Sequence, residues 1–113
     1  MAFIKTVAPS GGGSSTIPIL TYVDGVRGNG TLTISFNQSY NNIFVVSFAE
    51  NASETFTSVT FPTGSTHKEV ADVLNNAIAN GRAMKCYDIH NVASGTTFAT
   101  QWSSWHTTYV FTY

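Results

Sequence analysis

The residues with the strongest binding chemistry lie close together near the end of the sequence: Trp102, Trp105, His106 and Tyr109. Indole and phenol rings stack on the faces of sugar rings, and the same side chains dominate contacts between proteins. Aromatic residues also pack in hydrophobic cores. The cluster therefore fits core packing, a subunit contact or ligand binding, and we keep all three interpretations.

A second group with chemical potential is Cys86, Asp88 and His90, which share one face of a predicted strand because alternate residues point the same way. All three side chains can ligate a transition metal. No second spaced pair of ligands appears, although His67 or His106 could approach in the fold. The pattern favours ordinary strand polarity, with Cys86 buried as a small apolar residue. We expect neither a metal nor another cofactor.

Patterns for catalysis are weak. The segment Gly28-Asn29-Gly30 resembles part of a phosphate-binding loop, but it precedes a predicted strand, so no helix N-terminus would face a phosphate. The G-x-S-x-G elbow of many serine hydrolases does not occur. Glu50 and Glu54 flank a predicted turn, where we expect water to solvate them. We therefore predict a protein that is not an enzyme.

The composition narrows the classes of partner. Of the 113 residues only 10% are charged, and the net charge is −1, so a basic surface for nucleic acid or anionic lipid is not expected. A nearly uncharged surface rich in Thr and aromatic residues is easier to explain if partner subunits cover much of it. An extracellular domain with a neutral surface is the alternative. No secretory signal is recognisable and Cys86 has no cysteine partner, so we expect synthesis in the cytosol without export.

Residues 1–16 read as a separate segment. Phe3, Ile4 and Val7 form a short apolar hook, and residues 9–15 are rich in Gly and Ser, as in a flexible linker. We predict an extended arm that docks onto a neighbouring subunit; an arm folded back on its own domain is the alternative. Residues 17–113 are predicted to form a single β-rich domain.

Alternation of apolar and polar residues predicts strands within that domain. The predicted strands cover residues 17–23, 31–36, 43–48, 55–61, 83–92, 96–102 and 107–113. Turn residues separate them, among them Asp24-Gly25, residues 28–30, Ser94-Gly95 and Ser103-Ser104.

Residues 66–80 carry the pattern of an amphipathic helix. Thr66 and Glu69 have the spacing of a capping box, and Gly81 stands where a helix C-cap is expected. The apolar residues that follow are spaced by three and four: Val70, Val73, Leu74, Ala77 and Ile78. The predicted fold is therefore α+β and mostly β, an antiparallel sheet of five to seven strands with one helix packed on one face.

The order of these patterns over residues 42–113 resembles small domains encoded by phages and prophages of gut bacteria. The resemblance rests on a hairpin of residues 44–48 and 56–61, a helix opening at 66–69 and ending at 77–82, a strand from 84–87, and a closing aromatic strand at 109–111.

That resemblance implies a virion or tail-fibre-associated protein without a catalytic site. We expect a phage structural protein, a tail or fibre component or a capsid decoration protein, located in the virion. Its partners would be other copies of itself and other virion proteins. The alternative is a carbohydrate- or receptor-binding adhesion module that uses Trp102, Trp105 and His106 on a host surface glycan.

Overall fold

Alternation of apolar and polar residues places most of the described part of the chain in antiparallel β-strands. The computed structural model describes residues 19–51, 54–73 and 83–113. The strands in these ranges are β1 (Thr21–Ser35), β2 (Tyr40–Ala49), β3 (Phe56–Thr60), β4 (Thr66–Val73), β5 (Met84–Val92) and β6 (Thr97–Thr112). Their order in the sheet is β1-β6-β2-β5-β4, and β3 also pairs with β6. The prediction of a mostly-β antiparallel sheet is confirmed.

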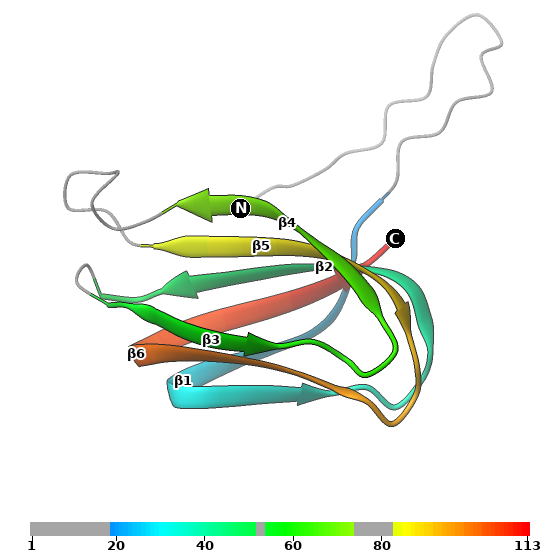
Figure 1. The fold of residues 1–113 in the computed structure, drawn as a ribbon, viewed down its shortest axis with the longest axis horizontal. Coiled ribbons are helices and arrows are strands. Elements are labelled where there is room, and N and C mark those ends of the chain that lie inside the picture. The colour runs from blue at the N-terminus through cyan, green and yellow to red at the C-terminus, as the bar shows by residue number, and fades with distance from the viewer. Residues whose placement is uncertain (1–18, 52–53, 74–82) are drawn as a thin grey trace, which may run out of the picture.

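β6 is the strand on which the sheet is assembled. One of its edges pairs with β1, from Thr21–Thr112 to Ser35–Thr97. The opposite edge pairs with β3 along the first half of β6 and with β2 along the second half. The sheet consequently curls, and the first half of β6 comes to face β5 (Figure 1). Phe98 of β6 and Tyr87 of β5 meet across the interior, with ring centroids 6.3 Å apart.

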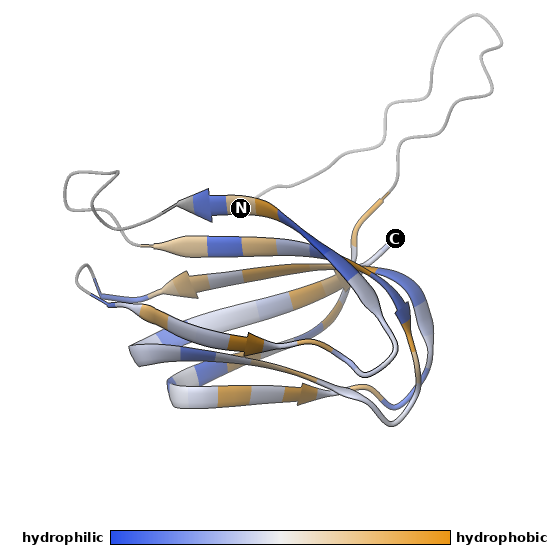
Figure 2. Ribbon diagram, in the orientation of Figure 1, coloured by the Kyte–Doolittle hydropathy of each residue, from blue (hydrophilic) through white to orange (hydrophobic). Residues whose placement is uncertain are grey.

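The core fills the space inside this curl. Apolar residues alternate with polar ones along the strands, which gives the sheet one apolar inner face (Figure 2). Its buried members are Ile34, Phe36, Ile43, Val45, Tyr87, Ile89, Val92, Phe98 and Val110. A smaller cluster of Ala49, Ala83 and Trp102, with Phe56 packed against it, closes the end of the curl at which β2 ends and β5 begins.

β1 and β6 are each one long strand where a turn was predicted. β1 runs through Asp24-Gly25 and residues 28–30, and β6 runs through Ser103-Ser104. The glycines mark bulges instead: the β1–β6 register shifts between Tyr22 and Asp24 and again next to Gly30, whose φ is 80°. Because the ladder resumes on the far side of each shift, as far as Ser35–Thr97, the pairing is kept and the irregularity is absorbed locally.

The predicted helix is wrong over residues 66–73, which form β4; residues 74–82 lie outside the described residues. A bulge between Glu69 and Ala71 explains the misleading spacing. It brings Glu69 and Asp72, three residues apart, onto the same side of the strand, where both pair with Lys85 (3.3 and 3.1 Å). Two residues spaced by three can therefore share one side of a bulged strand, as they do in a turn of helix. In the described ranges there is no helix, and hence none long and apolar enough to cross a membrane.

The predicted hairpin of residues 44–48 and 56–61 is also wrong as a pairing. β2 and β3 follow each other along the same edge of β6 rather than pairing with one another. The corrections to the helix and the hairpin remove two of the elements on which the resemblance to phage domains rests.

Candidate functional site

The predicted aromatic cluster is divided between the core and the surface. All four residues lie on β6, and the alternation of the strand turns Trp102 and His106 inward (1% and 0% exposed) and Trp105 and Tyr109 outward (43% and 39% exposed). Trp102 and His106 therefore cannot contact a ligand on the folded protein. Trp105 and Tyr109 remain as candidates.

Trp102 begins a buried chain of hydrogen bonds. Its Nε1 donates to Ser47 Oγ (2.9 Å), which lies 2.8 Å from Thr108 Oγ1, which in turn lies 3.0 Å from Thr100 Oγ1. Thr100 Oγ1 lies 3.3 Å from His106 Nε2. We call these five residues the hydroxyl chain. All of them are buried, and the chain supplies partners for polar groups that burial would otherwise leave unpaired.

The direction of the hydroxyl chain follows from its two ends. Indole Nε1 can only donate, and His106 Nδ1 faces the carbonyl of Ser104 (3.3 Å), which can only accept. His106 Nδ1 therefore carries a proton, and in the neutral ring, the form that burial favours, Nε2 accepts from the hydroxyl of Thr100. Each hydroxyl then donates toward His106 and accepts from the Trp102 side. Burial lowers the pKa of His106, against the opposing effects of the Ser104 carbonyl and nearby carboxylates.

The side of the β1–β6–β2 sheet turned away from the core carries the exposed aromatic residues. The ladder places Tyr22 opposite Phe111, Gly25 opposite Tyr109, and Arg27 opposite Thr107. On the other side of β6, Phe48 lies opposite Thr107. We call this surface the outer face, defined by Tyr22, Arg27, Phe48, Trp105, Thr107, Tyr109 and Phe111.

A glycine sets the position of the Tyr109 ring. A Cβ atom on Gly25 would lie 2.7 Å from Tyr109 Cδ1 and 2.8 Å from the Tyr22 hydroxyl. The two side chains therefore lie directly over the β1 backbone, and their rings meet edge to face at 6.4 Å. Phe48 supports Tyr109 from β2, with ring centroids 6.0 Å apart.

An ion pair lies beside these rings. Arg27 donates from Nε and Nη2 to both carboxylate oxygens of Glu50, at 2.8 to 3.0 Å. The hydroxyl of Thr107 donates to Glu50 Oε2 (2.7 Å), and the Arg27 guanidinium lies 4.8 Å from the Trp105 ring centroid. The hydrogen bond from Arg27, with that from Thr107, lowers the pKa of Glu50. Glu50 is therefore ionised and fixed between two donors.

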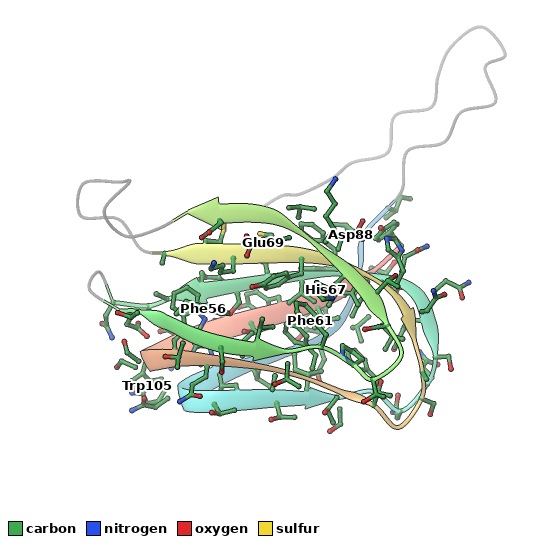
Figure 3. All side chains as sticks on the ribbon, viewed as in Figure 1. Phe56, Phe61, His67, Glu69, Asp88 and Trp105 are labelled. Carbon is green, nitrogen blue, oxygen red and sulfur yellow. The ribbon has the colours of Figure 1, made fainter. Side chains whose placement is uncertain are left out.

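The ion pair and the tyrosine border an open depression of about 430 Å³. Its lining residues are Arg27, Phe48, Ala49, Glu50, Thr107 and Tyr109. Trp105 lies next to it through its contact with Arg27, at the end of the molecule where β6 bends (Figure 3). The depression combines two partly exposed aromatic rings with a donor and an acceptor of opposite charge.

The prediction that Glu50 and Glu54 are solvated in a turn is wrong. Glu50 is held in the ion pair, and Glu54 is only 5% exposed. Glu54 Oε2 accepts from the amides of Glu50 and Asn51, and Oε1 accepts from the amide of Ser104 (2.8 to 3.2 Å). Glu54 thus fastens the segment after β2 to the bend of β6.

The predicted metal-ligand candidates are not gathered into one site. Asp88 contacts His90 (3.3 Å) at the opposite end of the molecule from Trp105, and also accepts from the Tyr113 hydroxyl. Cys86 is buried, which raises its pKa to about 11. His67 stacks on Phe61 instead (Figure 3). Within residues 19–51, 54–73 and 83–113, no three His, Cys, Asp or Glu side chains are grouped to hold a metal ion.

Three residues of the outer face were not proposed as site residues from the sequence: Arg27, Phe48 and Thr107. The one available signal was Arg27, a lone charge in a glycine-rich run of a weakly charged chain. The predicted arm residues Phe3, Ile4 and Val7 lie outside the described residues, so the arm stays a prediction.

Comparison of the chain with protein-family models, with curated proteins and with solved structures found no match. The site is therefore interpreted from its own geometry.

Proposed function

We propose that the chain is a non-enzymatic structural protein of a phage particle, a tail or fibre component or a capsid decoration protein, that works through contacts of its surface. The observation that carries the proposal is the exposure of large apolar side chains at the start of β1 and on the outer face. Ile19 and Tyr22 are each 58% exposed, and Trp105 and Tyr109 add to them. Tyr and Trp are enriched where proteins bind one another.

The charge distribution supports association through the outer face. Arg27 and Glu50 neutralise each other, so the ion pair adds no net charge that would repel a second copy. Ile19 and Tyr22 stand where the chain enters β1, directly after the predicted arm. A neighbouring copy that received residues 1–16 would be brought close to both side chains. We therefore propose other copies of the chain as the first partner and other virion proteins as the second.

Paired substitutions test this proposal. Ile19→Ser combined with Tyr22→Ser removes these exposed apolar groups without replacing a buried residue. Val70→Ser removes another exposed apolar group (44%), on β4, and serves as the control. We expect the wild-type chain and the control to associate with rising concentration in sedimentation velocity, and the double variant to stay monomeric with an unchanged melting temperature. Association of the double variant at wild-type strength, or a wild-type chain monomeric up to millimolar concentration, would contradict self-assembly.

The alternative function, a carbohydrate- or receptor-binding adhesion module, is favoured by a different observation. The depression on the outer face is lined by the rings of Phe48 and Tyr109 and by the ion pair of Arg27 and Glu50, and Trp105 lies beside Arg27. Of the residues predicted for this role, Trp105 is the one that reaches the surface, and Tyr109 takes the place of Trp102 and His106.

A further inference from the structure

The depression has the features of a small-ligand site. Its volume of about 430 Å³ falls in the range of known ligand pockets, roughly 300–1,000 Å³. Its floor and walls come from three neighbouring strands and the residue that follows β2, all held by ladder pairing. A ligand there would meet surfaces that are already in place.

The polar groups of the depression suit hydroxyl groups. Arg27 uses Nε and Nη2 on Glu50, and its two Nη1–H groups make no hydrogen bond to the described residues. The side chain of Arg27 is 63% exposed, so these donors face water. Two neighbouring sugar hydroxyls can accept from the two Nη1–H groups of Arg27, whose guanidinium plane is fixed by its paired hydrogen bonds to Glu50. Thr107 is nearly buried and positions Glu50 rather than reaching the ligand.

Two exposed aromatic rings offer apolar platforms, Tyr109 in the lining of the depression and Trp105 next to it. One side of the Tyr109 ring lies against Gly25, and the Trp105 ring lies against the Arg27 guanidinium; part of each ring stays exposed. The C–H faces of a pyranose ring pack on such rings while its hydroxyls point to the edge. Because Gly25, Phe48 and Arg27 already fix the rings, binding orders few side chains.

The charge balance selects the kind of sugar. Arg27 and Glu50 cancel, and the buried Glu54 beyond them is negative and bonded to amides. The surroundings therefore offer an anionic ligand no excess positive charge. A neutral ring with vicinal hydroxyls fits better than a phosphate or an acidic sugar.

We propose that the depression binds a neutral pyranose of a glycan, with Tyr109 against a C–H face, Trp105 beside Arg27, and Arg27, held in place by Glu50, donating to its hydroxyls. The inference rests on the proposed function in that both place binding on the outer face, but it names a different occupant for the Trp105 end. As part of a particle, the protein would then use Ile19 and Tyr22 for assembly and the depression for attachment.

Nuclear magnetic resonance titration of the full chain tests the site. The probes are maltotriose, cellotriose, lactose and mannotriose as neutral saccharides, with 3′-sialyllactose as the acidic comparison. We expect at least one neutral saccharide to shift the signals of Arg27, Trp105 and Tyr109 and to leave those of Val70 unchanged. Trp105→Ala, and separately Arg27→Met with Glu50→Gln, should weaken that binding by at least about tenfold. Val70→Ala is the matched control and should bind as the wild type does.

Each outcome decides between the ideas. No shift with any neutral saccharide, binding of 3′-sialyllactose alone, or unchanged affinity in the Trp105→Ala variant overturns the glycan inference. If saccharides fail but the same signals shift with protein concentration, the depression belongs to a contact between copies and the proposed function stands. Saccharide binding by a chain that stays monomeric supports the site while contradicting the proposed self-assembly.

Discussion

Replacing Trp102 with Phe tests whether the hydroxyl chain has a fixed direction. The substitution removes the Nε1–H group that donates to Ser47 Oγ. The phenyl ring that replaces the indole still packs against Phe56, whose ring centroid lies 5.0 Å from that of Trp102 in the wild-type structure. We expect the free energy of unfolding to fall by about 1 kcal/mol for the hydrogen bond and by about 1–2 kcal/mol for the lost ring volume. A domain of this size is stable by roughly 5–15 kcal/mol, so the variant should still fold.

The more specific effect is on His106. A protonated His106 must donate from Nε2 to Thr100, which would reverse the hydroxyls of Thr100 and Thr108. Ser47 Oγ would then accept from both Thr108 and Trp102, and its own proton would lose Thr108 as its acceptor. Without the Trp102 donor, the Ser47 proton can turn into the direction that the indole N–H occupied, so the reversal costs less. The Trp102→Phe substitution should therefore raise the pKa of His106 toward its ordinary value of 6.5.

The pH dependence of stability follows from the same shift. Because the pKa of His106 is lower in the folded chain than in the unfolded chain, the wild-type stability is complete above about pH 6.5 and falls as the pH drops toward the folded pKa. This loss on acidification should be smaller in the Trp102→Phe variant.

Two measurements check these effects. Urea unfolding followed by circular dichroism, at neutral pH and near pH 5, gives the free energies. Titration of the His106 ring signals, assigned with a His106→Gln variant, gives the pKa. Trp105→Phe makes the same chemical change on the outer face and serves as the control. It should leave the pKa of His106 unchanged and change the free energy of unfolding by no more than about 1 kcal/mol. An unchanged pKa of His106 in the Trp102→Phe variant would refute the directional chain.

Three further predictions use other features of the structure. Gly25→Ala should destabilise the fold by about 1–3 kcal/mol and displace the Tyr109 ring, because the new Cβ would overlap it; thermal unfolding and the Tyr109 ring signals report this. Glu54→Ala should cost about 1–3 kcal/mol, measured by urea unfolding, since three backbone amides lose their acceptor. Deleting residues 1–12 should leave the melting temperature nearly unchanged and abolish association in sedimentation velocity; an unfolded truncated chain would show that the arm belongs to the core.

The sheet was predictable from the sequence because alternation reports directly which side of a strand is buried. Residues 31–36 and 43–48 alternate or are apolar throughout, and both were placed in strands. The lengths of β1 and β6 were not predictable, because glycine and serine mark bulges as readily as turns. Which of the two occurs depends on a partner strand far away in the chain.

β4 shows the opposite failure, in which a local pattern is clear but misleading. Thr66 and Glu69 have the spacing of a capping box, yet both lie in a strand, opposite His90 and Tyr87 of β5. Pairing with β5 is a tertiary effect that local propensity cannot contain.

The candidate site was half predictable for a similar reason. Trp105 and Tyr109 were found by residue type, but their separation from Trp102 and His106 depends on how β6 continues through its bend. Arg27 lies on β1 and Glu50 follows β2, and these two strands do not pair with each other, so the contact could not be inferred from spacing.

The central position of β6 also governs how the chain can acquire its structure during synthesis. Among the described strands, β1 and β3 pair only with β6, so both stay unpaired until residues 97–112 have left the ribosome. Translation at roughly 5–20 residues per second leaves the long β1 edge exposed for several seconds. The ladder that then forms joins positions far apart in the sequence, such as Thr21 and Thr112, which slows folding and prolongs the time in which the unpaired edge can pair with other chains.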